Sequence, residues 1–291
     1  MSIRTIVHFC AAALIAAAWA PAPAAAARLT LKADGVKRTA TVILREPLKL
    51  RRRPLVIVLH GTNSHASLIR RRLGMEGFSH STSAIFVYPE AIKGRWAEKP
   101  GAAARRDLMF LRDLVARIAR NSRVDRRRVF LIGVSSGAAM AIRAACAGNG
   151  LPDTGLATVA TSLPADLAER CRPRRPIAYL AVENGESAER RPATARKTDE
   201  KKRANERWAK PPATKAAEIF ARAAHCAART HPAHFIERRR AGHTRIVVER
   251  FAHCQKPVEI IHIGGERHER AASKEFNAGV AIWKFLRKFG A

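Results

Sequence analysis

The segment Arg128-Val-Phe-Leu-Ile-Gly-Val-Ser-Ser-Gly137 joins an apolar run to a G-x-S-x-G pattern. The apolar run, bounded by arginines and a glycine, is typical of a strand that is buried on both faces of a sheet. The small residues at 137–147 favour a helix directly afterwards. At such a strand–turn–helix junction the central serine lies on a strained turn, with its hydroxyl above the sheet. The pattern therefore predicts that Ser135 is a nucleophile. It also predicts that the backbone N–H of Ser136 faces the oxyanion formed on attack.

The segments on either side of this junction alternate between strand and helix patterns. Strands are expected at 54–60, 84–89, 156–160, 176–183, 244–250 and 257–263, and helices at 105–120, 213–226 and 274–288. Near the N-terminus, apolar and polar residues alternate on both sides of Asp34-Gly35, which predicts a β-hairpin. This order favours an α/β fold with a mostly parallel central sheet, flanking helices and an N-terminal β-hairpin.

Two further elements of a hydrolytic site follow predicted strands. His60-Gly61-Thr62 ends the first strong strand, so the N–H of Thr62 is the predicted second oxyanion donor, and His60 is expected to shape this loop. A donor of this kind contributes about 3 kcal/mol to lowering the barrier. Where a serine lies on such a turn, the order along the chain is serine, acid, histidine. His268 follows the last predicted strand and is therefore the expected base. His243 precedes a strand, and His253 and His262 fall beside or within strands.

Taken together, these stretches resemble a known family, the secreted polyhydroxybutyrate depolymerase and feruloyl-esterase-like branch of the α/β-hydrolases. The resemblance implies a single-domain α/β-hydrolase fold and a carboxylic ester hydrolase without cofactor. It implies short hydroxyalkanoate polyesters, or hydroxycinnamoyl and acetyl esters, as substrates, and a late disulfide between Cys226 and Cys254. The matching segments, in chain order, are 54–61, 87–90 with Trp96, 107–111, 124–129, the serine turn leading into 138–146, Gly265 with His268, and Phe276 with 282–283.

The acid departs from the pattern of this family. The family has an aspartate just after the strand that corresponds to 176–182, whereas this chain reads Glu183-Asn-Gly-Glu-Ser187. Glu186 is the predicted acid and Glu183 the second choice, since a carboxylate is needed only to orient the histidine and balance its charge. The alternative is an incomplete triad.

The N-terminal 27 residues have the order of a secretory signal peptide. Arg4 precedes a short apolar stretch, and small residues near Ala26 follow Pro21 and Pro23. A membrane anchor is the alternative, although the apolar stretch is shorter than the roughly 20 residues that span a membrane. We therefore expect a secreted or periplasmic protein without a transmembrane segment after cleavage. Residues 28–291 are expected to form a single domain, in which 187–212 is a basic, solvated loop.

Four cysteines remain after the predicted cleavage, and an oxidising compartment favours their pairing. Proximity along the chain favours Cys146 with Cys171 and Cys226 with Cys254, although three pairings are open and free buried thiols are the alternative. The cysteines lack C-x-x-C spacing, so we expect no metal site.

The formal net charge of +30 indicates a strong attraction for polyanions. The expected partner of the basic clusters is an anionic surface or polymer. The alternative is that the arginines form a solvated surface without a partner. Specific nucleic-acid binding is not expected, because no aromatic residues interleave with the basic clusters. Two functions remain open. The first is a serine esterase acting on a small or polymeric ester. The second is a catalytically impaired hydrolase-fold protein that serves as a basic binding protein.

Overall fold

The computed structural model describes residues 25–44, 52–78, 84–148, 151, 154–160, 163–184, 212–227, 235–236, 245–264 and 276–291. Within these ranges ten strands form one sheet, in the spatial order β1-β2-β4-β3-β5-β6-β7-β10-β9-β8. Neighbouring strands are parallel from β4 through β10 and antiparallel at both flanks. The strands are β1 (Ala25–Ala33), β2 (Val36–Leu44), β3 (Arg53–Leu59), β4 (Ile85–Pro89), β5 (Val124–Val134), β6 (Gly155–Val159), β7 (Ala178–Asn184), β8 (Phe235–Ile236), β9 (Arg245–Arg250) and β10 (Val258–Gly264).

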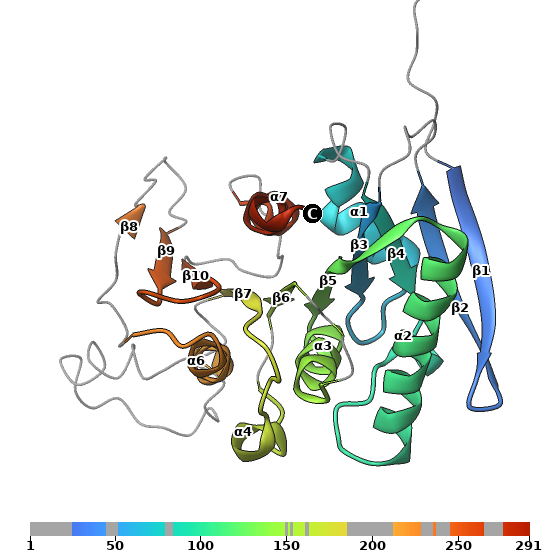
Figure 1. Cartoon of the computed structure of the whole chain (residues 1–291), viewed down its shortest axis with the longest axis horizontal. Coiled ribbons are helices and arrows are strands. Elements are labelled where there is room, and N and C mark those ends of the chain that lie inside the picture. Colours follow the sequence, from blue (N-terminus) through green and yellow to red (C-terminus); the bar gives the residue numbers. More distant parts are fainter. Residues whose placement is uncertain are drawn as a thin grey trace, which may run out of the picture.

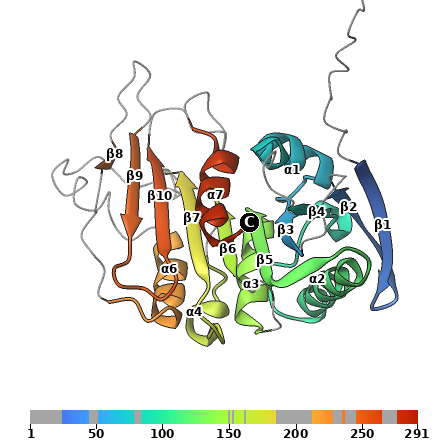
Figure 2. The same ribbon diagram turned by 45° about the horizontal axis from the view of Figure 1, so that its top comes forward.

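Helices cover both faces of this sheet (Figure 1). Figures 1 and 2 show α2, α3 and α6 on one face and α1 and α7 on the other. Each face has its own apolar core, since successive residues of a buried strand point to opposite sides. The predicted mostly parallel α/β architecture with flanking helices is confirmed. The helices are α1 (Ala66–Leu73), α2 (Ala102–Asn121), α3 (Ser136–Cys146), α4 (Leu167–Arg170), α6 (Pro212–Ala223) and α7 (Ala278–Leu286), with short 3-10 turns at Met75–Phe78, Ile92–Gly94 and Arg287–Phe289.

The predicted N-terminal hairpin is formed by β1 and β2. Its two-residue turn, Asp34-Gly35, has positive φ at both positions, 48° and 74°. Such a turn matches the twist of the two strands, and Gly and Asp tolerate this conformation. The strand β1 begins at Ala25 and pairs from there to Ala33. Cleavage near Ala26 would therefore remove the first pairs of the hairpin.

The parallel strands bring several chain segments to one edge of the sheet. Val134 at the end of β5 pairs with Val159 of β6, Val159 pairs with Val182 of β7, and Val182 pairs with Ile261 of β10. The segments that follow β5, β7 and β10 therefore all start at the same edge. This is where ligands bind in open α/β sheets.

Two disulfides connect the four cysteines expected to pair. Cys146 at the end of α3 is bonded to Cys171 after α4, and Cys226 after α6 is bonded to Cys254 between β9 and β10. Among the residues described above, no helix combines the length and the apolar character that crossing a membrane requires. The predicted signal peptide up to Ala24 and nearly all of the predicted basic loop at 187–212 lie outside the described residues.

Candidate active site

Ser135 lies on a sharp turn between β5 and α3. Its backbone has φ 52° and ψ −119°, a conformation that a residue with a side chain adopts only under strain. The surrounding backbone holds it there. The N–H of Ser135 donates to the carbonyl of Val159 at 2.9 Å, and its carbonyl accepts from the N–H groups of Ala138 and Ala139 at the start of the helix. The side chain is left exposed above the sheet edge. This geometry suits a reactive hydroxyl.

Glycines on both sides make the turn sterically possible. A Cβ on Gly133 would collide with the backbone of Gly137 and Ala138, and one on Gly137 would collide with the carbonyls of Leu59 and His60. The start of α3 is therefore packed directly against β5 and against the end of β3. Gly61 packs on the serine itself, because a Cβ there would lie 3.3 Å from the Cβ of Ser135. The G-x-S-x-G pattern thus reflects two close backbone contacts.

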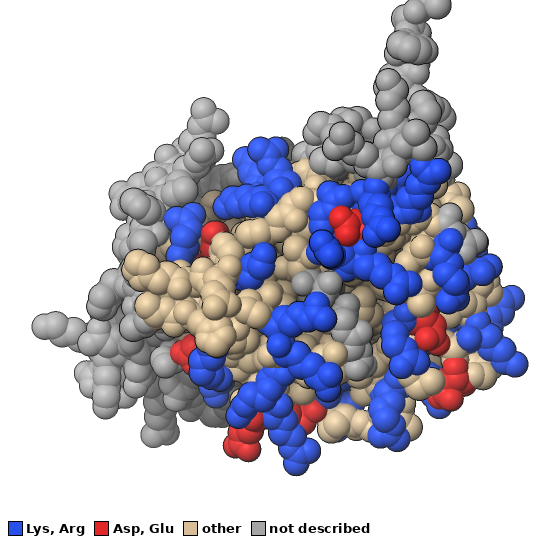
Figure 3. All heavy atoms as spheres, viewed as in Figure 1, with Lys and Arg blue, Asp and Glu red and all other residues tan. Residues whose placement is uncertain are grey.

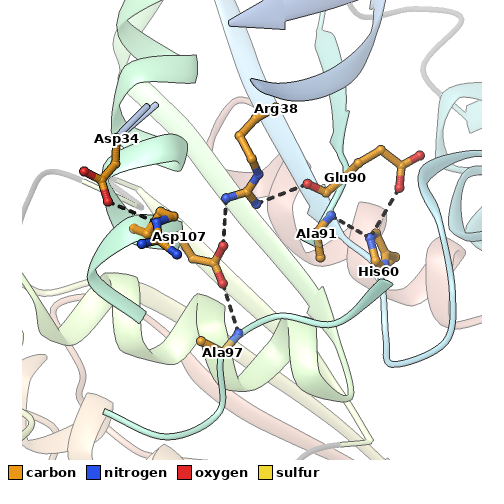
Figure 4. Close-up of polar contacts among 8 residues, drawn as sticks. Asp34, Arg38, His60, Glu90, Ala91, Ala97 and Asp107 are labelled. Atoms are coloured by element: carbon orange, nitrogen blue, oxygen red, sulfur yellow. Dashed lines mark hydrogen bonds and ion pairs between the residues drawn. The ribbon is translucent and has the colours of Figure 1, made fainter. Parts of the chain in front are cut away.

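The loop after β3 is shaped by a buried histidine, as expected from the sequence. The ring of His60 donates from Nδ1 to the carbonyl of Gly61 at 2.8 Å, and its Nε2 accepts from the N–H of Ala91 at 3.1 Å (Figure 4). Burial lowers the pKa of His60, against the opposing hydrogen bond to Gly61 and the charge of Glu90. The neutral ring therefore uses both nitrogens to hold the loop against the end of β4.

Thr62 and Ser136, the predicted oxyanion donors, flank the serine. Thr62 follows Gly61, which contacts Ser135, and Ser136 is the first residue of α3. The N–H groups of the first helical turn have no partner within the helix, and the helix dipole favours negative charge there. The side chain of Ser136 is buried, and its backbone N–H belongs to this first turn. Their role as an oxyanion hole remains a prediction.

A pocket of about 340 Å³ opens beside the serine. Its lining contains both polar and apolar residues, and Arg143 of α3 holds the backbone of one of them, Glu98. Arg143 donates to both carboxylate oxygens of Asp166, at 2.6 and 2.9 Å, and to the carbonyl of Glu98 at 2.8 Å. The hydrogen bond from Arg143 lowers the pKa of Asp166. The lining residues are Glu98, Ser135, Ser136, Ala139, Ala160, Leu163 and Pro164.

The predicted acid and base are less completely placed. Glu183 is the penultimate residue of β7, at the sheet edge where β5 ends, and its side chain is buried. Tyr179 and Glu183 are four residues apart in β7, so both side chains lie on the same face of the sheet, where Tyr179 stacks on Phe220 of α6. Glu186 and His268 lie outside the described residues, in the segments that follow β7 and β10. The roles of all three residues remain predictions.

Sequence reasoning missed the buried ion pairs that hold the walls of this site. Arg38 of β2 donates to Asp107 of α2 at 2.9 Å and to the carbonyl of Glu90 at 3.2 Å, and Asp107 also accepts from the N–H of Ala97 (Figure 4). Arg38 and Asp107 are 69 residues apart in the sequence, and Arg143 and Asp166 are 23 residues apart, so no local sequence pattern reveals either pair. The only signal was a charged residue at an otherwise apolar helix position. Among the described residues no group of three metal-ligating side chains occurs.

Part of the chain is similar in sequence to known proteins. Residues 40–156 match the family model described as "Esterase PHB depolymerase". The curated protein "Putative esterase NocK" of Nocardia uniformis subsp. tsuyamanensis is 34% identical over 137 residues. The aligned region is 45% of this chain and 39% of that protein, so the chain spans about two fifths of the relative's length.

The chain is also similar to solved structures at low sequence identity. The structure described as "Crystal Structure of sOPH Native" has a TM-score of 0.51 at 16% identity, and the match covers 69% of this chain and 77% of that one. "FphF, Staphylococcus aureus fluorophosphonate-binding serine hydrolases F, substrate bound" has a TM-score of 0.45 at 13% identity, covering 56% of this chain and 80% of its own.

Proposed function

We propose that this chain is an exported serine carboxylic ester hydrolase. The match of residues 40–156 to the family model described as "Esterase PHB depolymerase" supports the proposal, as does the similarity to a curated putative esterase. Its substrates are short hydroxyalkanoate polyesters or oligoesters, or hydroxycinnamoyl or acetyl esters. The observation that carries the proposal is the strained backbone of Ser135 at the end of β5, beside a pocket of about 340 Å³. Strain of this kind costs about 1–3 kcal/mol and persists where a site uses it.

The proposed reaction proceeds through an acyl-enzyme. The Oγ of Ser135 attacks the ester carbonyl while His268 accepts its proton, and the N–H groups of Thr62 and Ser136 stabilise the oxyanion. His268 then gives the proton to the leaving alcohol, and the acyl group stays on Ser135. Water, deprotonated by His268, releases the acid and restores the serine. Glu186 orients the imidazole and balances its positive charge.

The direct test replaces the nucleophile. The mature protein should release p-nitrophenol from short-chain acyl esters, and Ser135→Ala should lower kcat by at least about a thousandfold. Ser67→Ala, an exposed serine of α1, is the control and should keep full turnover. Equal turnover by wild type and Ser135→Ala would remove Ser135 from the mechanism.

The identity of the acid requires a separate comparison. Glu186→Gln and Glu183→Gln are isosteric and remove one charge each. The variant that lacks the true triad acid should lose about two to four orders of magnitude in kcat, because the imidazolium is then left without its counter-charge. If both variants keep full kcat, the triad has no acid at either position.

The compartment is part of the proposal. Two disulfides, Cys146–Cys171 and Cys226–Cys254, support an oxidising environment, as does the N-terminal pattern. Cell fractionation should recover a chain shortened by about 26 residues outside the cytoplasm. Recovery of the full-length chain in the cytoplasm would contradict export.

A second candidate is a basic binding protein on a hydrolase scaffold. The net charge of +30 favours it, and Figure 3 shows Lys and Arg side chains over much of the described part of the viewed face, with fewer Asp and Glu side chains between them. A fluorophosphonate probe distinguishes the two candidates. Labelling at Ser135 supports the esterase, whereas a failure to label, together with salt-sensitive binding to an anionic polymer, supports the binding protein.

A further inference from the structure

A larger cavity, of about 670 Å³, adjoins the serine pocket. It lies between the segment after β4 and the first turn of α2, and Glu98 lines both hollows. The two hollows are therefore neighbours at Glu98. The lining residues are Ile92, Lys93, Arg95, Trp96, Ala97, Glu98, Lys99, Pro100, Gly101, Ala102, Ala103, Arg106 and Asp107.

The charges of this cavity are unbalanced. Arg106 is paired with Asp34 at 3.0 Å, and Asp107 with the buried Arg38 at 2.9 Å, so these four charges compensate one another. The cations Lys93, Arg95 and Lys99 form no ion pair within the described part of the chain, and all three are exposed. Apart from the paired Asp107, the cavity lining has one carboxylate, that of Glu98, which also lines the serine pocket. The cavity therefore favours a negatively charged group.

Backbone and buried donors at the same cavity add to this preference. The helix α2 is 20 residues long, and its first turn has neither a side-chain cap nor an acidic residue. Its N-terminal residues Gly101, Ala102 and Ala103 line the cavity, where unsatisfied N–H groups and the helix dipole attract anions. Trp96 also lines the cavity. It is fully buried, and its indole Nε1–H has no hydrogen-bond partner among the described residues.

The segment that presents the three cations is held in place from behind. Four hydrogen bonds fix its backbone: from Ala91 to His60, from Arg38 to the carbonyl of Glu90, from Ala97 to Asp107, and from Arg143 to the carbonyl of Glu98. Figure 4 shows the first three converging on this segment from β2, β3 and α2. Lys93 has φ 52°, a left-handed conformation that is unfavourable for a lysine. A lysine is thus fixed at a costly backbone position beside the cavity.

We propose that this cavity binds the free carboxylate of the substrate, so that the enzyme prefers acid-terminated hydroxyalkanoate oligoesters over neutral esters. The inference rests on the proposed function and deepens it, because it names the class of ester. The carboxylate lies among Lys93, Arg95, Lys99 and the N–H groups at the start of α2, and the chain passes Glu98 to place an ester bond at Ser135. Charge-assisted hydrogen bonds of this kind are roughly twice as strong as neutral ones.

Kinetics with a matched pair of substrates test the inference. The substrates are the linear trimer of 3-hydroxybutyrate with its free carboxylate and the same trimer ending in a carboxamide. The variant Lys93→Gln/Arg95→Gln/Lys99→Gln should raise KM for the acid trimer at least tenfold and leave kcat/KM for the amide trimer within twofold. Because the three side chains are exposed, the variant should fold with a Tm no lower than that of the wild type.

The control removes the same charge elsewhere. Arg120→Gln/Arg126→Gln/Arg127→Gln changes three exposed arginines outside both cavities and should affect neither substrate by more than twofold. If the cavity variant changes both trimers equally, or if the control variant weakens the acid trimer as strongly, the carboxylate site is overturned.

Binding without turnover separates this inference from the esterase proposal. Calorimetry with Ser135→Ala should show binding of the acid trimer that weakens at least tenfold when the three cavity cations are also removed. Turnover of p-nitrophenyl esters without such binding overturns the carboxylate site and leaves the esterase standing. Binding that depends on the three cations, without turnover by the wild type, supports the site and contradicts the esterase.

Discussion

The serine turn depends on Gly137 having no side chain. A Cβ at this position would meet two carbonyls of the loop after β3, and backbone cannot move aside as a flexible side chain can. We expect Gly137→Ala to lower the free energy of unfolding by roughly 3 kcal/mol. Gly77→Ala is the control, since a Cβ there meets nothing within 4 Å. Urea unfolding of both variants measures the difference. Equal stability would contradict the close contact.

The neutral ring of His60 makes stability depend on pH. Burial lowers its pKa in the folded protein, whereas the unfolded chain has the ordinary value of about 6.5. The contribution of His60 to stability is therefore complete above about pH 6.5 and is lost as the pH falls from there through the folded pKa. Urea unfolding between pH 7.5 and 5 should show this loss.

Substitution of His60 isolates the effect. His60→Asn should lower stability at pH 7.5 by about 1–3 kcal/mol, through lost buried hydrogen bonds, and should flatten the slope below pH 6.5. His253→Asn changes an exposed histidine and should leave the slope as in wild type. If the free energy of unfolding of His60→Asn falls with pH as steeply as that of the wild type, other groups cause the loss of stability below pH 6.5.

At the scale of elements, α2 is attached to β2 by a buried ion pair. The side chains of Arg38 and Asp107 are 2% and 6% exposed, and the guanidinium of Arg38 also lies 4.0 Å from the centre of the Phe110 ring. Desolvation by burial lowers the pKa of Arg38, and the neighbouring Asp107 opposes that shift. Asp107→Asn should cost about 3–5 kcal/mol, since it leaves a buried charge without its partner.

The double variant Arg38→Met/Asp107→Asn tests this reason. Removing the buried charge together with its partner should recover part of the lost stability, with a coupling energy of at least about 1 kcal/mol in chemical denaturation. Strictly additive losses would show that the pair does not couple α2 to β2.

Helices and strands with a strong local pattern of apolar residues could be predicted from the sequence, and those without such a pattern could not. The strands β3, β5 and β10 are apolar runs, and their positions agree with the prediction to within a few residues. The helix α1 went unpredicted because ASLIRRRL has three consecutive arginines and few apolar positions. The two-residue β8 and the one-turn α4 are set by their neighbours in space. The cavity walls likewise depend on pairs between residues distant in sequence.

For the whole molecule, the net charge of +30 opposes compactness. Like charges repel more strongly in the folded state, and salt screens them: the Debye length is about 30 Å at 0.01 M and about 10 Å at 0.1 M. We expect Tm to rise by several degrees between 0.01 and 0.3 M NaCl. Calorimetry at fixed pH measures this, with equal osmolality of sucrose as the uncharged control. A falling Tm would mean that the ion pairs outweigh the repulsion.

The backbone of Ser135 has a consequence for the evolution of this chain. A glycine would adopt φ 52° and ψ −119° without strain, so Ser135→Gly should raise Tm by a few degrees while ester turnover disappears. Thermal scanning of the variant decides this, and an unchanged or lower Tm would refute it. Selection for folding alone would let the hydroxyl be lost by mutation. A higher Tm for Ser135→Gly would therefore mean that the wild-type chain keeps a hydroxyl at the expense of its own stability.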